Sequence, residues 1–128
     1  MSIVLEGLYY SKDHEWVRME GEKAFIGITD FAQHALGSIV YVELPEVGDE
    51  IVAEDNLGVV ESVKAASDII MPVSGEILEV NEETVDNPES INSAPYDNYL
   101  VVVALKDPEE LNDLMNKEAY EEFISKEE

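Results

Sequence analysis

The sequence contains no cysteine and only two histidines, His14 and His34. The lack of cysteine excludes disulfides, thiolate metal sites and cysteine nucleophiles. The two histidines lie far apart in the chain without an H-x-x-x-H spacing, and no D-x-D-x-D-G calcium loop is present. We therefore expect no bound metal.

Positive charge is also scarce. The chain has 7 Lys and Arg residues against 30 Asp and Glu residues, which gives a formal net charge of -23. Such a charge repels nucleic-acid phosphates and anionic membrane surfaces, so we expect neither as a partner. Basic patches on protein partners are the natural complement, and mutual repulsion between copies favours a monomer.

Long apolar runs are missing as well. No run reaches the roughly 18 apolar residues of a membrane span. The first six residues lack the basic start and apolar stretch of a signal peptide. With 128 residues, 45% of them apolar, the chain is predicted to form one globular domain over 1–128, located in the cytoplasm.

Short apolar runs broken by Gly, Pro, Asn and Asp are the dominant pattern, and they predict a mainly β protein. The expected strands are 15–19, 24–28, 39–43, 58–63, 67–71, 75–80 and 99–105. Gly or Pro at 20–22, 45–49, 72–75 and 87–88 suits the turns between them. Two packed β layers would bury alternate residues of both sheets in one sandwich.

Two regions are predicted to be helical. Thr29 or Asp30 is suited to cap a short helix over 30–36 that Gly37 ends. Asp107 and Pro108 predict the start of a C-terminal helical tail over about 108–125. The apolar residues of this tail recur at a helical period, so one face should pack on a sheet.

Lys64 is the only Lys or Arg between residues 24 and 105, a stretch that holds sixteen Asp and Glu residues. An isolated flexible amine is easy for a modifying enzyme to select. Small residues around Lys64 and β-rich runs on both sides favour a tight hairpin. A helix over 60–67 is the alternative structure for this segment. The simplest interpretation of Lys64 is an exposed surface charge with no further role.

Several motifs, in their order and spacing, resemble the H protein family of the glycine cleavage system. They are KDHEWV at 12–17, GITDFAQ at 27–33, YVELPEVG at 41–48, GVVESVKAASD at 58–68, PVSGE at 72–76 and NSAPY at 92–96. The match runs from about Gly7 to the C-terminal helix. It covers nearly the whole chain.

The resemblance implies a flattened β sandwich of the barrel-sandwich hybrid type, similar to lipoyl and biotinyl domains, with lipoate in amide linkage to Lys64. It implies a non-catalytic carrier that takes an aminomethyl group from the pyridoxal-phosphate-dependent glycine decarboxylase to the tetrahydrofolate-dependent aminomethyltransferase. Dihydrolipoyl dehydrogenase would then reoxidise the carrier. A lipoate ligase or a lipoyl or octanoyl transferase would attach the group.

The resemblance also implies site residues besides the attachment lysine. A cleft that shelters the loaded arm would be lined by Glu15 and Asp68, with Asp13, His14 and Thr29 as further candidates. The lipoylating enzyme would recognise Glu61, Val63 and Ala65. Each has a simpler interpretation: Glu15 as an exposed strand residue, Asp68 as a turn cap, Thr29 as a helix cap and His14 as a half-buried surface imidazole.

Two departures from the family pattern stand out. Asn98 and Tyr99 replace a frequent Gly-Trp pair, and Ala35 stands where some relatives carry His, which puts a histidine role in the cleft in doubt unless His34 substitutes. A biotin carrier would place Met beside the lysine, a 2-oxoacid dehydrogenase domain would place Asp before it, and a Schiff-base enzyme would need the amine away from carboxylates. A lipoate-relay protein and an acidic interaction domain remain as alternatives.

Overall fold

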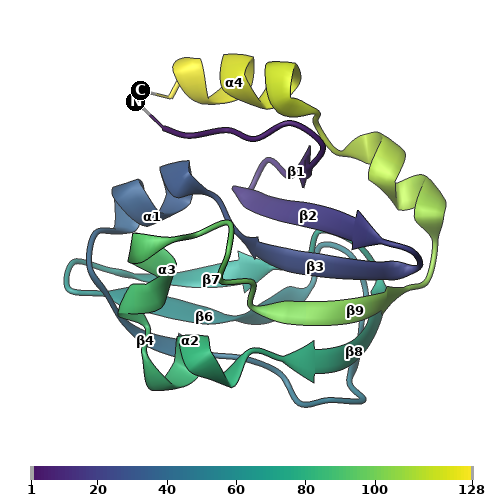
Figure 1. The fold of residues 1–128 in the computed structure, drawn as a ribbon, viewed down its shortest axis with the longest axis horizontal. Helices are drawn as coiled ribbons and strands as arrows, with labels where there is room; N and C mark the ends of the chain where they lie inside the picture. The colour runs from purple at the N-terminus through teal and green to yellow at the C-terminus, as the bar shows by residue number, and fades with distance from the viewer. Residues whose placement is uncertain (1, 128) are drawn as a thin grey trace.

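The structure is a computed structural model that describes residues 2–127. Two antiparallel sheets lie one behind the other, with short helices at one end and along one side (Figure 1). The predicted mainly β sandwich with short helices is confirmed. No helix within residues 2–127 is long and apolar enough to cross a membrane.

The larger sheet has six strands in the order β1-β2-β3-β9-β8-β5. Its strands are β1 (Tyr9–Tyr10), β2 (Glu15–Glu20), β3 (Lys23–Ile28), β9 (Val101–Leu105), β8 (Gly75–Val80) and β5 (Glu50–Ile51). The β2–β3 hairpin turns at Gly21, whose φ of 65° is a left-handed conformation that glycine adopts without strain. This sheet provides most of the core and one wall of the site.

The smaller sheet has three strands in the order β4-β6-β7, namely β4 (Ile39–Glu43), β6 (Asn56–Ser62) and β7 (Ala66–Ile70). β6 and β7 form an antiparallel hairpin in which Glu61 pairs with Ala66. This is the hairpin that the sequence predicts around Lys64, and the alternative helix over 60–67 is wrong. The β-branched residues on both sides of the turn favour strands over that helix.

The helices begin at polar caps. Thr29 accepts a hydrogen bond from the Ala32 amide and begins α1 (Asp30–Leu36), and Gly37 ends it, as predicted. Asn81 caps α2 (Glu82–Asp86), and α3 (Glu89–Ser93) follows Pro88. These two short helices were not predicted, because Asn87 and Pro88 read as a turn between strands.

The C-terminal tail, predicted to be helical over about 108–125, consists of two helices. A 3-10 helix, η1 (Pro108–Asp113), begins at its predicted Asp107 cap, and α4 (Lys117–Ser125) begins at Asn116. Between them, Met115 exchanges backbone hydrogen bonds of 2.8 and 2.7 Å with Tyr10. This pairing holds the chain extended and ends the first helix.

The two sheets enclose the main apolar core. Buried residues from both layers, including Ile26, Val103, Val60 and Ile69, form one cluster. A second cluster lies on the outer side of β1 and β2 under α4, where Tyr10 and Tyr120 stack with ring centroids 4.5 Å apart. The tail therefore contributes to both cores: η1 packs on the first and α4 on the second.

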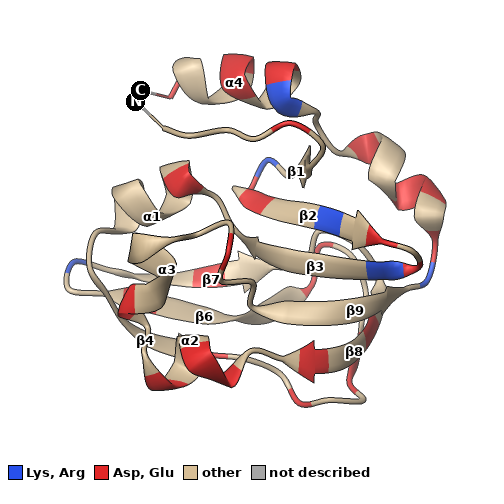
Figure 2. Ribbon diagram, viewed as in Figure 1, with Lys and Arg blue, Asp and Glu red and all other residues tan. Residues whose placement is uncertain are grey.

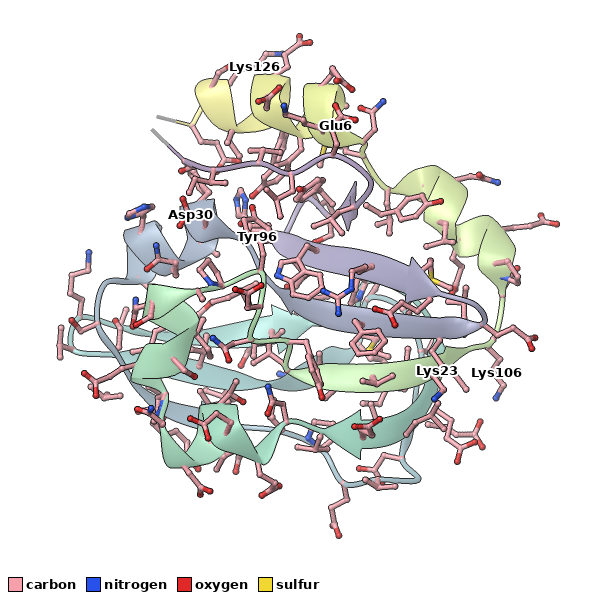
Figure 3. All side chains as sticks on the ribbon, viewed as in Figure 1. Glu6, Lys23, Asp30, Tyr96, Lys106 and Lys126 are labelled. Carbon is pink, nitrogen blue, oxygen red and sulfur yellow. The ribbon has the colours of Figure 1, made fainter. Side chains whose placement is uncertain are left out.

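The N-terminal segment runs beside α4 and is held by tyrosine hydroxyls. Asp30 and Tyr96 point toward the same region beneath this segment (Figure 3). The Ile3 amide donates to the Asp30 carboxylate over 2.8 Å, and the Tyr96 hydroxyl donates to the Ile3 carbonyl over 2.6 Å. These bonds attach the start of the chain to α1.

Candidate functional site

Lys64 lies at the tip of the β6–β7 hairpin, in the turn between the two strands. The Ser62 amide donates to the Ala65 carbonyl over 2.8 Å and closes the turn. The Val63 amide donates to the Ser38 carbonyl over 3.1 Å, which joins the tip to the loop between α1 and β4. The backbone under Lys64 is therefore fixed at two points.

The Ser62 side chain adds a further restraint. Its hydroxyl oxygen accepts hydrogen bonds from the Lys64 and Ala65 amides, each 3.1 Å long. Serine does this well in turns because its short side chain reaches the backbone two or three residues ahead. The backbone of the tip is thus ordered while the Lys64 side chain remains exposed.

The Lys64 side chain passes over Gly37. A Cβ atom placed on Gly37 would lie 3.2 Å from Lys64 Cε and 3.8 Å from Nζ. Gly37 has a φ of 82°, so glycine serves here both for its conformation and for the close approach of the lysine stem. None of the ion pairs within residues 2–127 involves Lys64.

The amine is also isolated within the fold. Figure 2 shows a blue segment at the tip of the β6–β7 hairpin, on the far left, with the other clearly visible basic segments around β2, β3 and α4. The sequence holds no second Lys or Arg from 24 to 105. A modifying enzyme that approaches this end of the molecule therefore meets one primary amine.

Glu15 joins the two sheets at the start of β2. Its side chain is buried, with 2% of the residue exposed. The Ser11 hydroxyl donates to Oε1 over 2.6 Å, and the Ile70 amide on β7 donates to Oε2 over 3.2 Å. Burial raises the pKa of Glu15 to about 8, although both hydrogen bonds lower it. The exposed-strand interpretation of Glu15 is wrong.

Asp13 and Asp68 lie on either side of this corner. The charge of Asp13 helps to raise the pKa of Glu15, and Asp13 lines a cavity of about 320 Å³ with Ser11 and Glu54. Asp68 is exposed on β7, two residues before Ile70, whose amide binds Glu15. Glu15 and Asp13 are therefore neighbours where β2 meets β7, whereas Asp68 is related to this corner only through its position two residues before Ile70 on β7.

His14 and Thr29, the other two predicted cleft residues, meet at Tyr120 on α4. The Tyr120 hydroxyl is 2.9 Å from His14 Nδ1 and 2.7 Å from Thr29 Oγ1. Thr29 is fully buried, and His14 Nε2 lies 3.2 Å from the Glu127 carboxylate. The His14 Nδ1 atom and the Thr29 hydroxyl thus contact α4, and His14 Nε2 contacts a residue just after this helix. Thr29 is also the α1 cap.

The predicted recognition residues flank the tip. Glu61 is half-buried at the end of β6, whereas Val63 and Ala65 stand exposed on either side of Lys64. Val63 has 71% of its surface exposed, a high value for a large apolar residue. All three are therefore near the amine.

Sequence reasoning missed the residues that hold the site in place. Ser62 was interpreted only as a small neighbour of Lys64. A serine at the start of a turn often accepts hydrogen bonds from backbone amides two or three residues ahead, and this signal could have identified it. Ser11 gives no local signal, because its importance comes from its bond to buried Glu15. Within residues 2–127 there is no cluster of three or more possible metal ligands.

A sandwich of two antiparallel sheets that exposes one lysine at an ordered hairpin tip is typical of the lipoyl- and biotin-carrier class of domains. Comparison with known proteins agrees. The sequence profile described as "Glycine cleavage H-protein" matches residues 8–127. The chain therefore belongs to the glycine cleavage H-protein family.

Individual relatives are similar over nearly their whole length. The chain is 61% identical over 124 residues to the glycine cleavage system H protein of Thermoanaerobacter sp. (strain X514), covering 97% of this chain and 98% of the relative. It is 60% identical over 121 residues to that of Alkaliphilus oremlandii (strain OhILAs), covering 94% and 95%. The crystal structure of a glycine cleavage system H protein from Mycobacterium marinum has a TM-score of 0.84 at 36% identity and covers 95% of this chain and 99% of that one.

Proposed function

We propose that this chain is the lipoyl carrier of a glycine cleavage system and that Lys64 holds the lipoyl group. The observation that supports this most directly is the exposed, unpaired amine on an ordered hairpin tip in a member of the H-protein family. The residues around the tip suit attachment: small Ser and Ala side chains leave the amine accessible to another protein.

Attachment forms an amide between Lys64 Nζ and the lipoyl carboxyl carbon. The ammonium loses a proton, and the free amine attacks the carbonyl carbon of an activated lipoyl group such as lipoyl-AMP, a mixed anhydride. The amide forms as the acyl–phosphate bond breaks and AMP leaves. Because the tip backbone is fixed by Ser62 and Ser38, the attacking atom moves only with the lysine stem. A lipoate ligase or a lipoyl transferase would deliver this activated lipoyl group. An octanoyl transferase would form the same amide with an octanoyl chain, which becomes lipoyl only after two sulfur atoms are inserted.

Bound lipoate would supply the disulfide and dithiol chemistry that carries an aminomethyl group from glycine decarboxylase to the tetrahydrofolate-dependent aminomethyltransferase and is reset by dihydrolipoyl dehydrogenase. The protein supplies the tether, which raises the concentration of the arm at each docked site. In this role the chain is a carrier subunit without catalytic residues of its own. We place it in the cytoplasm as a monomer.

The corner between β2 and β7 is the cleft we propose for an aminomethyl-bearing arm. Glu15 and Asp13 provide carboxyl groups there. We propose that the exposed Asp68 meets the arm at the edge of this cleft, two residues along β7 from Ile70. With a pKa of about 8, Glu15 is mostly protonated at neutral pH, and an arriving ammonium would lower that pKa and form a charged hydrogen bond. His14 and Thr29 support this corner through Tyr120.

The test is lipoylation of the purified chain by a lipoate ligase with lipoate and ATP, followed by intact mass and peptide mapping. We expect one lipoyl-sized increase, confined to the peptide that contains Lys64 and absent from Lys64→Ala. No increase in the folded chain with an active ligase, or an increase that persists in Lys64→Ala, would reject the proposal. The Lys64→Ala control keeps the acidic surface and removes only the amine of residue 64.

A further inference from the structure

The outer face of the β4-β6-β7 sheet continues from the lysine tip and carries two rows of side chains. The strand registers place Tyr41, Glu61 and Ala66 in one row and Glu43, Val59 and Asp68 in the next. We call these six residues the hairpin face. Their side chains are exposed or half-buried, whereas the alternate residues Val42, Val60 and Ile69 point into the core.

The hairpin face carries apolar side chains beside its carboxylates. Tyr41 is 46% exposed and neighbours Glu61, three residues before Lys64. An irregularity between Ile39 and Tyr41 inserts Val40, which is 56% exposed, so two consecutive large apolar residues of β4 are exposed. Bulges of this kind redirect side chains, and exposed tyrosine is enriched among residues that anchor protein interfaces.

The remaining residues of the face are acidic. Glu61 lies between Tyr41 and Ala66, and Val59 lies between Glu43 and Asp68. Lys64 is the only basic residue in the stretch of chain that forms this sheet. The formal net charge of -23 adds a negative electrostatic field around the whole molecule. The complementary surface is therefore a protein patch that presents apolar and basic residues.

The reach of the amine identifies which partner needs this face. An unmodified lysine extends about 6 Å from its Cα, so an enzyme that acts on Nζ must contact the residues beside the tip. A protein that receives the finished lipoyl arm can dock farther away, because the arm is much longer. The hairpin face, one register row from the tip, is within the footprint of the first kind of partner.

We infer that the hairpin face, with Tyr41 as its apolar anchor on β4, is the docking surface for the enzyme that attaches lipoate, which would present apolar and basic residues to it. The inference rests on the proposed function of Lys64. It assigns to Tyr41, Val59 and Glu43 a part in partner selection that is separate from the chemistry at Nζ. Whether the enzyme lipoylates Lys64 then depends on the surface of the β4-β6-β7 sheet as well as on the sequence of the turn.

The experiment measures kcat and KM for lipoylation of the apo chain by lipoate ligase, with product followed by intact mass. Tyr41→Ser removes the exposed aromatic side chain of the face, and Glu43→Lys reverses one of its charges. Glu79→Lys is the matched charge control, on an exposed strand position of the other sheet, and Val47→Ser is the control for an exposed apolar residue beyond the far end of β4.

We expect Tyr41→Ser to raise KM about tenfold with kcat nearly unchanged, as for an anchoring interface residue. Glu43→Lys should raise KM severalfold at low salt, with the difference fading as ionic strength rises. The KM and kcat of both control variants should stay close to those of the unaltered chain. If Tyr41→Ser and Glu43→Lys are lipoylated with unaltered kinetics, the docking inference is wrong even though Lys64 is the attachment site.

A competition assay separates docking from chemistry. Lys64→Ala should inhibit lipoylation of the unaltered chain competitively, and adding Tyr41→Ser to it should weaken that inhibition about tenfold. Equal inhibition by the two competitors would overturn the inference. So would a loss confined to glycine decarboxylase assays, because the face would then belong to a different partner. Absence of any lipoylation in the unaltered chain instead rejects the proposed function.

Discussion

Replacing Glu15 by Gln should change how the stability of the protein depends on pH. Glu15 is buried between the sheets, and burial raises its pKa from 4.5 to about 8. The folded protein therefore keeps this proton up to about pH 8, whereas the unfolded chain releases it near pH 4.5. Since the folded state binds more protons across this window, its stability falls as pH rises from 4.5 to about 8.

The size of the effect follows from the shift. One group that is protonated only in the folded state changes the free energy of unfolding by about 1 kcal/mol or slightly more per pH unit. Across the whole window the limit is about 5 kcal/mol, and we expect about 2–3 kcal/mol because water and nearby dipoles relax around the ionised carboxyl. Gln cannot ionise, and its amide can still bond to Ser11 and Ile70.

The assay is urea unfolding of the unaltered chain and Glu15→Gln from pH 5.5 to 8.5. Between pH 5.5 and pH 8.5, Glu15→Gln should gain about 2–3 kcal/mol of stability relative to the unaltered chain. Glu79→Gln, at an exposed position, corrects for removal of one negative charge from the acidic surface. Parallel curves for Glu15→Gln and the unaltered chain would refute the assignment of a buried, protonated Glu15.

Three further substitutions test the scaffold. Ser62→Ala should lower the free energy of unfolding by about 1 kcal/mol and speed amide exchange at Ala65, measured by NMR; unchanged exchange would contradict the role of the hydroxyl. Gly27→Ala should lower the melting temperature, at a cost of about 2–3 kcal/mol, because the new Cβ would lie 2.6 Å from the buried Trp16 ring. Tyr120→Phe keeps the stacked ring but loses two hydrogen bonds of the hydroxyl, so urea unfolding should show a loss of about 1–3 kcal/mol; no loss would show these bonds to be unimportant.

The strands were predictable because their signals are local. β-branched runs bounded by Gly and Pro indicate β2, β3, β4, β6, β7, β8 and β9, and the structure confirms each within a few residues. β1 and β5 are two residues long, too short to show a period of two. The break at Met115 was also beyond local reasoning, since its cause is pairing with Tyr10 at the other end of the chain.

The candidate site also has some features that the local sequence indicates and others that depend on the fold. Lys64 stood out because it is the only basic residue in a long acidic stretch, and the flanking β runs indicated a hairpin. The burial of Glu15 depends on how the two sheets approach each other, which no local pattern contains. The exposed pair Val40 and Tyr41 depends on a strand irregularity, and the sequence there reads as an ordinary strand.

The most direct test of the carrier role is glycine-dependent exchange of carbon dioxide by glycine decarboxylase in the presence of this chain. Three forms are compared: the chain lipoylated on Lys64, the unmodified chain, and Lys64→Arg treated with the same lipoylating enzyme. We predict sustained exchange with the lipoylated chain and only background exchange with the other two. Equal exchange with the unmodified chain, or none with a fully lipoylated one, would contradict the account.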